Sequence, residues 1–154
     1  MTKSPSDRIS KVELRQAQPG DYQFAESLYV NSMRFLLTEL GAWNERDILS
    51  KFKSYFELDE ARIIVVDGAD VGWWQISEVD HAINLDQVYL IDGFRARGIG
   101  SRLIQDLFAK AETESKPVLL SVVRNNSAVA LYRRLGFRVI DEDGYKLHMR
   151  WDPP

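Results

Sequence analysis

The 154-residue sequence contains no cysteine. This absence excludes disulfide bonds, cysteine-ligated zinc and a thiol nucleophile from the chemistry of the chain. We also expect the protein to work without a metal cofactor.

Long apolar runs and a surplus of basic residues are missing as well. No stretch approaches the roughly 20 apolar residues of a membrane span. The first ten residues, MTKSPSDRIS, lack the apolar segment of a signal peptide. The formal net charge of −3 argues against nucleic acid as the main partner, because phosphate backbones are held by excess basic side chains. We predict a cytoplasmic protein with neither a membrane nor a nucleic-acid partner.

The composition is that of an ordinary globular domain. Hydrophobic residues make up 45% and charged residues 28%, and four Trp, six Tyr and seven Phe provide material for a core. The length suits one domain. We assign the polar residues 1–10 to a flexible leader and residues 11–154 to a single domain.

The apolar pattern of the first sixty residues predicts one strand followed by helices. The strand starts at Val12, and Asp21 can cap a helical stretch that Gly41 ends and that we divide into two helices. Another helix starts at Asn44, and its expected buried side chains are Ile48, Leu49, Phe52 and Phe56.

The remainder of the sequence predicts strands with two intervening helices. In chain order these are a strand over 61–66, a turn at Asp67–Gly68, a hairpin partner from Val71, a long strand over 83–91, a helix from Gly98 with Ile99, Leu103, Leu107 and Ala111 on one face, a strand after Pro117, a short helix ending at Gly136 and a closing hairpin. The order is β-α-α-β-β-β-α-β-α-β-β. Since hairpins and crossovers are mixed, we predict an α/β fold, a mixed sheet of about seven strands flanked by about four helices.

The stretch DGFRARGIGSRL combines glycine and arginine just ahead of a helix. It carries Arg95, Arg97 and Arg102 and, after its first residue, no acid, although the first turn of a helix normally attracts Asp or Glu. Gly98 and Gly100 lack side chains, so their amides can approach an anion closely. Amides together with two or three guanidinium groups suit a pyrophosphate. A surface turn with solvated arginines is the alternative.

A second candidate lies in NNSAVALYRRLGF, where Asn125 and Tyr132 are seven residues apart. On a helix, seven steps of about 100° return to nearly the same direction, with about 10 Å between the two residues. Asn125, Asn126 and Ser127 are all good helix caps, yet only one cap is needed, which leaves another polar side chain for a different role. A tyrosine packed in the core is the alternative for Tyr132.

Together these two stretches resemble the GNAT superfamily of N-acetyltransferases. The residues that carry the likeness are Arg95, Gly98 and Gly100 of an RxxGxG pattern, and Asn125, Ala128, Leu131, Tyr132, Gly136 and Phe137 of an NxxAxxLYxxxGF pattern. The motifs cover about residues 83–140, and the order of elements agrees from about residue 12 onward.

The resemblance implies a site for acetyl-CoA as cosubstrate, between the strand over 83–91 and the strand after Pro117, which separate in this family. The implied contacts are the backbone of Val88, Tyr89 and Leu90 for the pantetheine arm, Arg97, Gly98, Ile99, Gly100 and Ser101 for the pyrophosphate, with Arg95 and Arg102 beside it, and Asn125 for the pantetheine. Tyr132 is implied as the general acid that protonates the departing thiolate.

The implied reaction is direct attack of a small-molecule or peptide amine on the thioester, with a backbone amide holding the developing oxyanion. Positions where relatives carry a glutamate base hold Asn84 and Leu120 here, so the base is unassigned. Asp86, which by alternation shares a strand face with Val88 and Leu90, and Glu78 are the candidate bases. Surface or turn roles remain open for both, and His81 suits a turn.

The acceptor region implied by the family is the early helical segment. Its residues of interest are Tyr29, Arg34, Phe35, Glu39, Trp43, Glu45 and Asp47. Trp73 and Trp74 should point to opposite sheet faces, one into the core and the other toward the acceptor. A catalytically silent acetyl-CoA sensor is the alternative function, and homodimers are common in this family.

Overall fold

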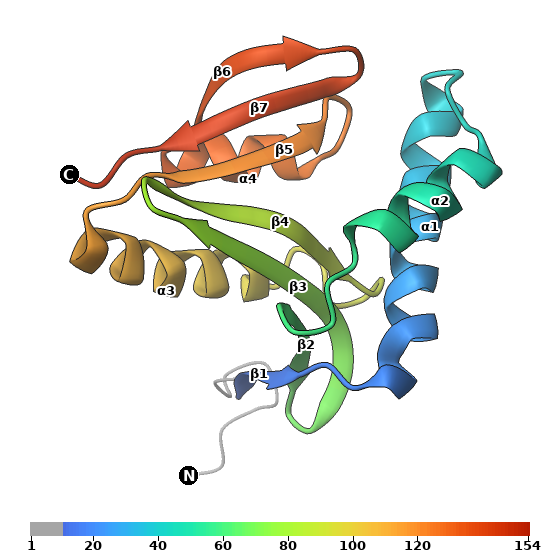
Figure 1. Cartoon of the computed structure of the whole chain (residues 1–154), viewed down its shortest axis with the longest axis horizontal. Coiled ribbons are helices and arrows are strands. Elements are labelled where there is room, and N and C mark those ends of the chain that lie inside the picture. The colour runs from blue at the N-terminus through green and yellow to red at the C-terminus, as the bar shows by residue number, and fades with distance from the viewer. Residues whose placement is uncertain (1–10) are drawn as a thin grey trace, which may run out of the picture.

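The structure is a computed structural model that describes residues 11–154, and the predicted leader lies outside the described residues. The chain forms one seven-stranded mixed sheet with four α-helices (Figure 1), which confirms the predicted fold class. Within the described residues, no helix has the length and apolarity that crossing a bilayer requires.

The elements follow the predicted order. They are β1 (Val12–Gln16), a short 3-10 helix (Pro19–Asp21), α1 (Tyr22–Glu39), α2 (Glu45–Tyr55), β2 (Ala61–Val66), β3 (Ala69–Val79), β4 (Ala82–Leu90), α3 (Ile99–Glu114), β5 (Val118–Val123), α4 (Ala128–Leu135), β6 (Arg138–Asp143) and β7 (Lys146–Trp151).

The prediction of two helices between Asp21 and Gly41 is wrong, because α1 is continuous over its 18 residues. No glycine or proline interrupts it, and buried side chains such as Tyr29 and Leu37 hold it against the sheet. Asp21 stands at its N-terminus without capping it. The carboxylate instead accepts hydrogen bonds from the backbone N–H of Gln18 and the guanidinium of Arg15.

Helix α2 begins as predicted. The side chain of Asn44 accepts a hydrogen bond from the backbone N–H of Asp47 at 3.0 Å, which satisfies one amide of the first turn. Ile48 and Phe52 are buried, but Leu49 is 38% exposed, contrary to prediction. One helical step of about 100° beyond Ile48 turns its side chain away from the sheet.

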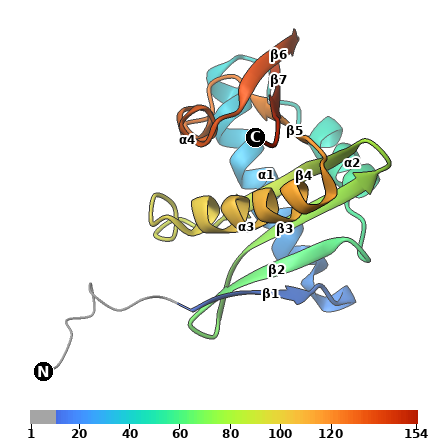
Figure 2. The same cartoon turned by 90° about the vertical axis from the view of Figure 1, so that its left-hand side faces the viewer.

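The two faces of the sheet carry separate hydrophobic clusters. Helices α1 and α2 pack on one face with Trp73, whereas α3 and α4 pack on the other with Trp74 (Figure 1 and Figure 2). The two tryptophans therefore point to opposite faces, as predicted. Both are at least 97% buried, so neither lines an acceptor site, contrary to the second half of that prediction.

Strands β4 and β5 are the only parallel neighbours among the described strands, and they pair over a short length. Their register runs from Ile83 opposite Val118 to Leu85 opposite Leu120 and stops there. Beyond this point the two strands diverge, as Figure 1 shows. The sheet is thus split at its centre.

A β-bulge at Asp86 stands where that pairing stops. Gln75 and Ile76, which are adjacent on β3, face Gln87 and Leu85 on β4, so Asp86 is an extra residue. The bulge shifts the alternation: Leu85 and Val88 both contact the α3 and α4 cluster. The prediction that Asp86 shares a face with Val88 and Leu90 is therefore wrong.

Candidate active site

The split between β4 and β5 holds a cavity of about 100 Å³. Its walls include Leu85, Leu120 and Tyr132 from the cluster under α3 and α4, and Tyr29 and Tyr89 from the cluster under α1 and α2. Residues from both faces meet in it, so the opening passes through the sheet. We call this cavity the central opening.

The β4 residues predicted to face the pantetheine arm lie at its edge. Val88, Tyr89 and Leu90 pair with β3 on one side, whereas β5 has already diverged on the other. Their backbone groups on that second side have no strand partner. Such an open strand edge can pair with an extended ligand, as a strand added to a sheet would.

Beyond β4 the chain makes the predicted glycine-rich turn into α3. Gly98 caps the helix with φ +78°, a left-handed conformation that glycine adopts without strain. A Cβ atom at Gly98 or at Gly100 would meet no other atom of the described residues within 4 Å. The Ile99 side chain is 4% exposed and belongs to the core, so only its amide, with that of the neighbouring Ser101, is suited to a ligand in front of the helix.

The arginines of this turn differ in their contacts. Arg95 is held by the end of β4, since its Nε donates to the carbonyl oxygen of Leu90 at 3.1 Å. The Arg97 guanidinium lies 4.8 Å from the ring centre of Phe94 on the exposed surface of the loop. Arg102 is in the first turn of α3, which contains no acid.

Asn125 precedes α4 instead of lying on it, so the prediction that it shares a helical face with Tyr132 is wrong. The N-cap of α4 is Ser127, and the preceding Asn126 accepts at its Oδ1 a hydrogen bond from the N–H of Ala128 at 2.9 Å. Asn125 Nδ2 donates to the carbonyl oxygen of Leu36 in α1 at 3.1 Å. Its Oδ1 is buried without a hydrogen-bond partner in the described residues. A buried acceptor of this kind is suited to a ligand N–H.

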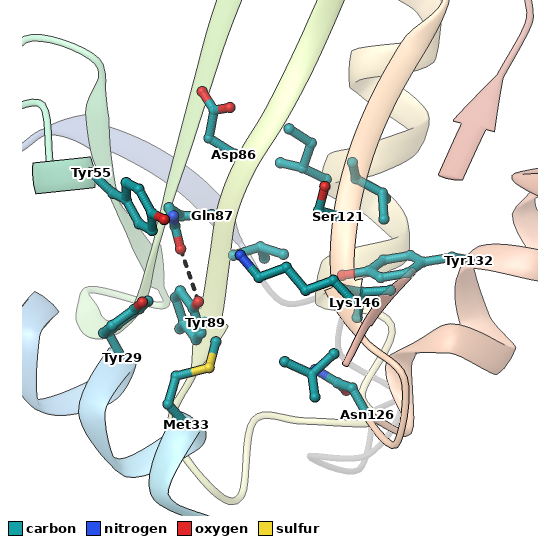
Figure 3. A pocket seen from close by; sticks show the side chains of 15 residues that line it. Tyr29, Met33, Tyr55, Asp86, Gln87, Tyr89, Ser121, Asn126, Tyr132 and Lys146 are labelled. Atoms are coloured by element: carbon teal, nitrogen blue, oxygen red, sulfur yellow. Dashed lines mark hydrogen bonds between the residues drawn. The ribbon is translucent and has the colours of Figure 1, made fainter. Parts of the chain in front are cut away.

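Tyr132 belongs both to the core and to the central opening. Its ring is 6% exposed and packs edge-on against Phe137, with 5.8 Å between ring centres. Its hydroxyl points into the opening (Figure 3). Burial raises the pKa of Tyr132 to about 12, so the hydroxyl keeps its proton at neutral pH.

The two candidate bases lie in different places. Asp86 lines the central opening, and burial raises the pKa of its carboxyl, while the nearby Ser77 hydroxyl lowers it. Glu78 is not part of that lining, and its carboxylate forms an ion pair with Lys110 of α3 at 3.2 Å. His81 lies in the turn between β3 and β4, as predicted.

Of the early-helix residues expected near an acceptor, Tyr29 reaches the opening. Three of the others form surface ion pairs: Arg34 with Glu45 at 3.4 Å, and Asp47 with Lys51 at 3.1 Å. Arg34 also lies over the Trp43 ring. Acidic residues near Trp43 are thus neutralised by their own neighbours, and Phe35 is 71% exposed.

The sequence did not predict several lining residues, namely Tyr55, Gln87, Ser121 and Lys146. A signal existed for Lys146, because β7 alternates strictly between buried and partly exposed residues. Leu147 and Met149 enter the α3 and α4 cluster, so Lys146 projects from the opposite face. That Lys146 meets the Tyr55 ring at the end of α2 depends on how distant elements pack, which no local pattern reveals.

Comparison with known proteins agrees with this arrangement. The model of the acetyltransferase (GNAT) domain matches residues 59–139. An uncharacterised N-acetyltransferase of Archaeoglobus fulgidus is 28% identical over 125 residues, which are 75% of this chain and 84% of that protein.

Solved structures show the same fold. The PaiA N-acetyltransferase of Thermoplasma acidophilum in complex with coenzyme A superimposes with a TM-score of 0.73 at 18% identity, over 92% of this chain and 99% of that one. The N-acetylglutamate synthase of Neisseria gonorrhoeae, in complex with coenzyme A and N-acetyl-glutamate, gives 0.65 at 16% identity, over 96% of this chain and 36% of that one.

The chain belongs to the GNAT acetyltransferase family, since the family model covers more than half of it. The resemblance carried by the two motifs is confirmed. The class of enzyme that follows is an acetyl-CoA-dependent N-acetyltransferase.

Proposed function

We propose that the protein transfers an acetyl group from acetyl-CoA to a primary amine by direct attack. The observation that carries the proposal is the central opening, which crosses the sheet where β4 and β5 diverge. Two substrates can meet there from opposite faces. The donor occupies the side of α3 and α4, and the acceptor enters from the side of α1 and α2.

The residues on the donor side fit coenzyme A. Gly98 and Gly100 leave open space in front of the α3 N-terminus, where amides and the Arg97 guanidinium suit a pyrophosphate. The buried Oδ1 of Asn125 suits an amide N–H of the pantetheine arm. The unpaired edge of β4 at Val88–Leu90 suits the same arm. Acetyl-CoA supplies the activated acetyl thioester.

The chemistry then falls to three groups of this chain. Asp86 accepts the proton that the amine loses as its bond to the carbonyl carbon forms. A backbone N–H on the open edge of β4 stabilises the negative charge that develops on the carbonyl oxygen. Tyr132 donates its hydrogen bond toward sulfur as the carbon–sulfur bond breaks.

The high pKa of Tyr132 suits this donor role. A thiol in water has a pKa of about 8.5, well below the value of about 12 for Tyr132. Complete proton transfer from the tyrosine is therefore uphill, whereas donating a hydrogen bond to the developing thiolate is favourable. Because the chain has no cysteine, the acetyl group passes to the amine without a cysteinyl intermediate.

Two measurements test the proposal. Coenzyme A at about 100 times its Kd should stabilise the folded protein by about 2.7 kcal/mol, seen as a rise in Tm. Thiol release from acetyl-CoA should then appear with at least one member of an amine panel. If coenzyme A leaves Tm unchanged, the donor site is wrong. If it raises Tm while every amine is silent, the protein is an acetyl-CoA sensor instead.

A further inference from the structure

Lys146 brings a positive charge into the central opening from the acceptor side. Its side chain leaves β7, passes the end of β5 and extends toward β4, as Figure 3 shows. Its Nζ lies 5.8 Å from the centre of the Tyr55 ring, within the range of a cation–π contact. The lysine therefore lines the path of an incoming acceptor.

Within the part of the chain that the structure describes, this ammonium group has no acidic partner. Among residues 11–154, no carboxylate lies within 4.0 Å of the Lys146 Nζ, which contacts the Tyr55 ring instead. Other cations on the same side are paired: Lys51 with Asp47, and Arg34 with Glu45. Taking a cation partly out of water without a counter-ion is unfavourable. An anion bound beside Lys146 would offset that cost.

The opening thus offers charges of opposite sign on different walls. Asp86 comes from β4, and Lys146 comes from β7 across the gap (Figure 3). An acceptor with a second positive charge, such as a diamine, is repelled by the lysine. An acceptor with a negative group beside its amine finds a partner for each end.

We propose that the acceptor is an aminocarboxylate, a primary amine with a carboxylate close to its nitrogen, and that Lys146 binds the carboxylate. This inference rests on the proposed acetyl transfer and narrows its acceptor class. The cavity of about 100 Å³ leaves room for a small polar head group. A head group of that size, as in a free amino acid, fits the opening.

Matched pairs of acceptors test the proposal by turnover. Each pair consists of an amino acid and its carboxamide, with a diamine of similar length as a third member. The wild type should show a higher kcat/KM for the amino acid than for the carboxamide, by roughly tenfold or more, as a charge-assisted contact allows. Lys146→Gln should lose this preference, because its kcat/KM should fall more for the amino acid than for the carboxamide. Lys146→Glu should reverse it in favour of the diamine.

Two variants serve as controls. Lys146→Arg keeps the charge and should retain much of the preference. Lys53→Gln removes a positive charge from an exposed position of α2 outside the opening, and its preference should match the wild type. A wild type that favours the carboxamide or the diamine would overturn the proposal. So would an equal loss with all acceptors in Lys146→Gln, which would place the lysine against the donor.

Binding gives a readout that needs no turnover. In the presence of coenzyme A, an N-acetyl amino acid should raise Tm more than its carboxamide does, and Lys146→Gln should remove the difference. Equal shifts in the wild type overturn the acceptor class while leaving the donor site intact. If coenzyme A itself does not stabilise the protein, the proposed function is wrong, and the inference about the acceptor is wrong as well.

Discussion

The donor side and the acceptor side of the central opening are built in different ways. The proposed donor contacts come mostly from one continuous stretch, from Val88 on β4 to Arg102 on α3, with Asn125 added from a second motif. The acceptor side takes single residues from separate elements: Tyr29 from α1, Tyr55 from α2 and Lys146 from β7. Residues from one continuous stretch form a motif whose spacing can be recognised in the sequence. Scattered residues form no such motif, so the shared cosubstrate is predictable and the acceptor is not.

The largest effect should come from the residue that lies between the two sides. Tyr132→Phe should lower kcat by roughly 10²- to 10³-fold, because the hydrogen-bond donor to the departing sulfur is lost. Coenzyme A affinity, measured by titration calorimetry, should change by less than about threefold, since the ring still packs against Phe137. If affinity and Tm fall together with kcat, the tyrosine has only a packing role.

A change confined to the acceptor side should leave the donor untouched. Asp86→Asn should lower kcat by roughly tenfold to a hundredfold, because the proton acceptor is lost and water replaces it poorly. Coenzyme A affinity should stay at the wild-type value. Equal activity of variant and wild type at neutral pH would show that another group takes the proton.

The pH dependence of the wild type and of Asp86→Asn tests the assignment of Asp86 as the base. Burial raises the pKa of Asp86. Wild-type activity should therefore fall as pH drops through this raised value, and the activity of Asp86→Asn should not show this fall. The folded state holds the Asp86 proton more tightly than the unfolded chain does. Stability therefore decreases as pH rises above the unfolded pKa, and Asp86→Asn should match or exceed the wild-type Tm at pH 7.

A charge reversal on the donor side should give a smaller effect, and it should lower the affinity for coenzyme A instead of kcat. Arg97→Glu should weaken coenzyme A by roughly tenfold to fiftyfold, because a guanidinium beside the pyrophosphate becomes a carboxylate. Titration calorimetry measures the change. Arg46→Glu, an equal charge change on the exposed surface of α2, is the matched control and should bind normally. Equal affinities of the two variants would contradict the phosphate loop.

The smallest effect tests the space in front of α3. Gly100→Ala should stabilise the free protein by about 0.5–1 kcal/mol, since alanine is the better helix former and its Cβ meets nothing within 4 Å. The same methyl group should weaken coenzyme A by about threefold to tenfold if the pyrophosphate lies there. Thermal melts with and without coenzyme A separate the change in the stability of the free protein from the change in coenzyme A affinity. Unchanged affinity would place the phosphates elsewhere.

Much of the fold could be predicted because its signals are local. The helical spacing of Ile99, Leu103, Leu107 and Ala111 predicted one buried face of α3, and all of them are buried. The Asp67–Gly68 turn joins β2 to β3, with positive φ at both residues, as a tight hairpin requires. These features depend on a few neighbouring residues.

The errors concern features that depend on distant parts of the chain. The bulge at Asp86 reflects how β4 pairs with β3, and strict alternation cannot show it. The start of α4 depends on the polar residues before it: Ser127 is the N-cap and Asn126 accepts from the N–H of Ala128, which leaves Asn125 outside the helix. In each case the residue was named correctly and its surroundings were not.

The hydrogen bond between Asn125 and Leu36 has a mechanical consequence. Where β4 and β5 have separated, no backbone pairing spans the mouth of the split, yet this amide fastens the loop after β5 to α1. The same side chain keeps its other end, Oδ1, for a ligand. Asn125 thus joins the two halves of the sheet beside the hydrogen bond from Lys51 of α2 to Tyr145, and a substitution there would remove one of these two polar contacts.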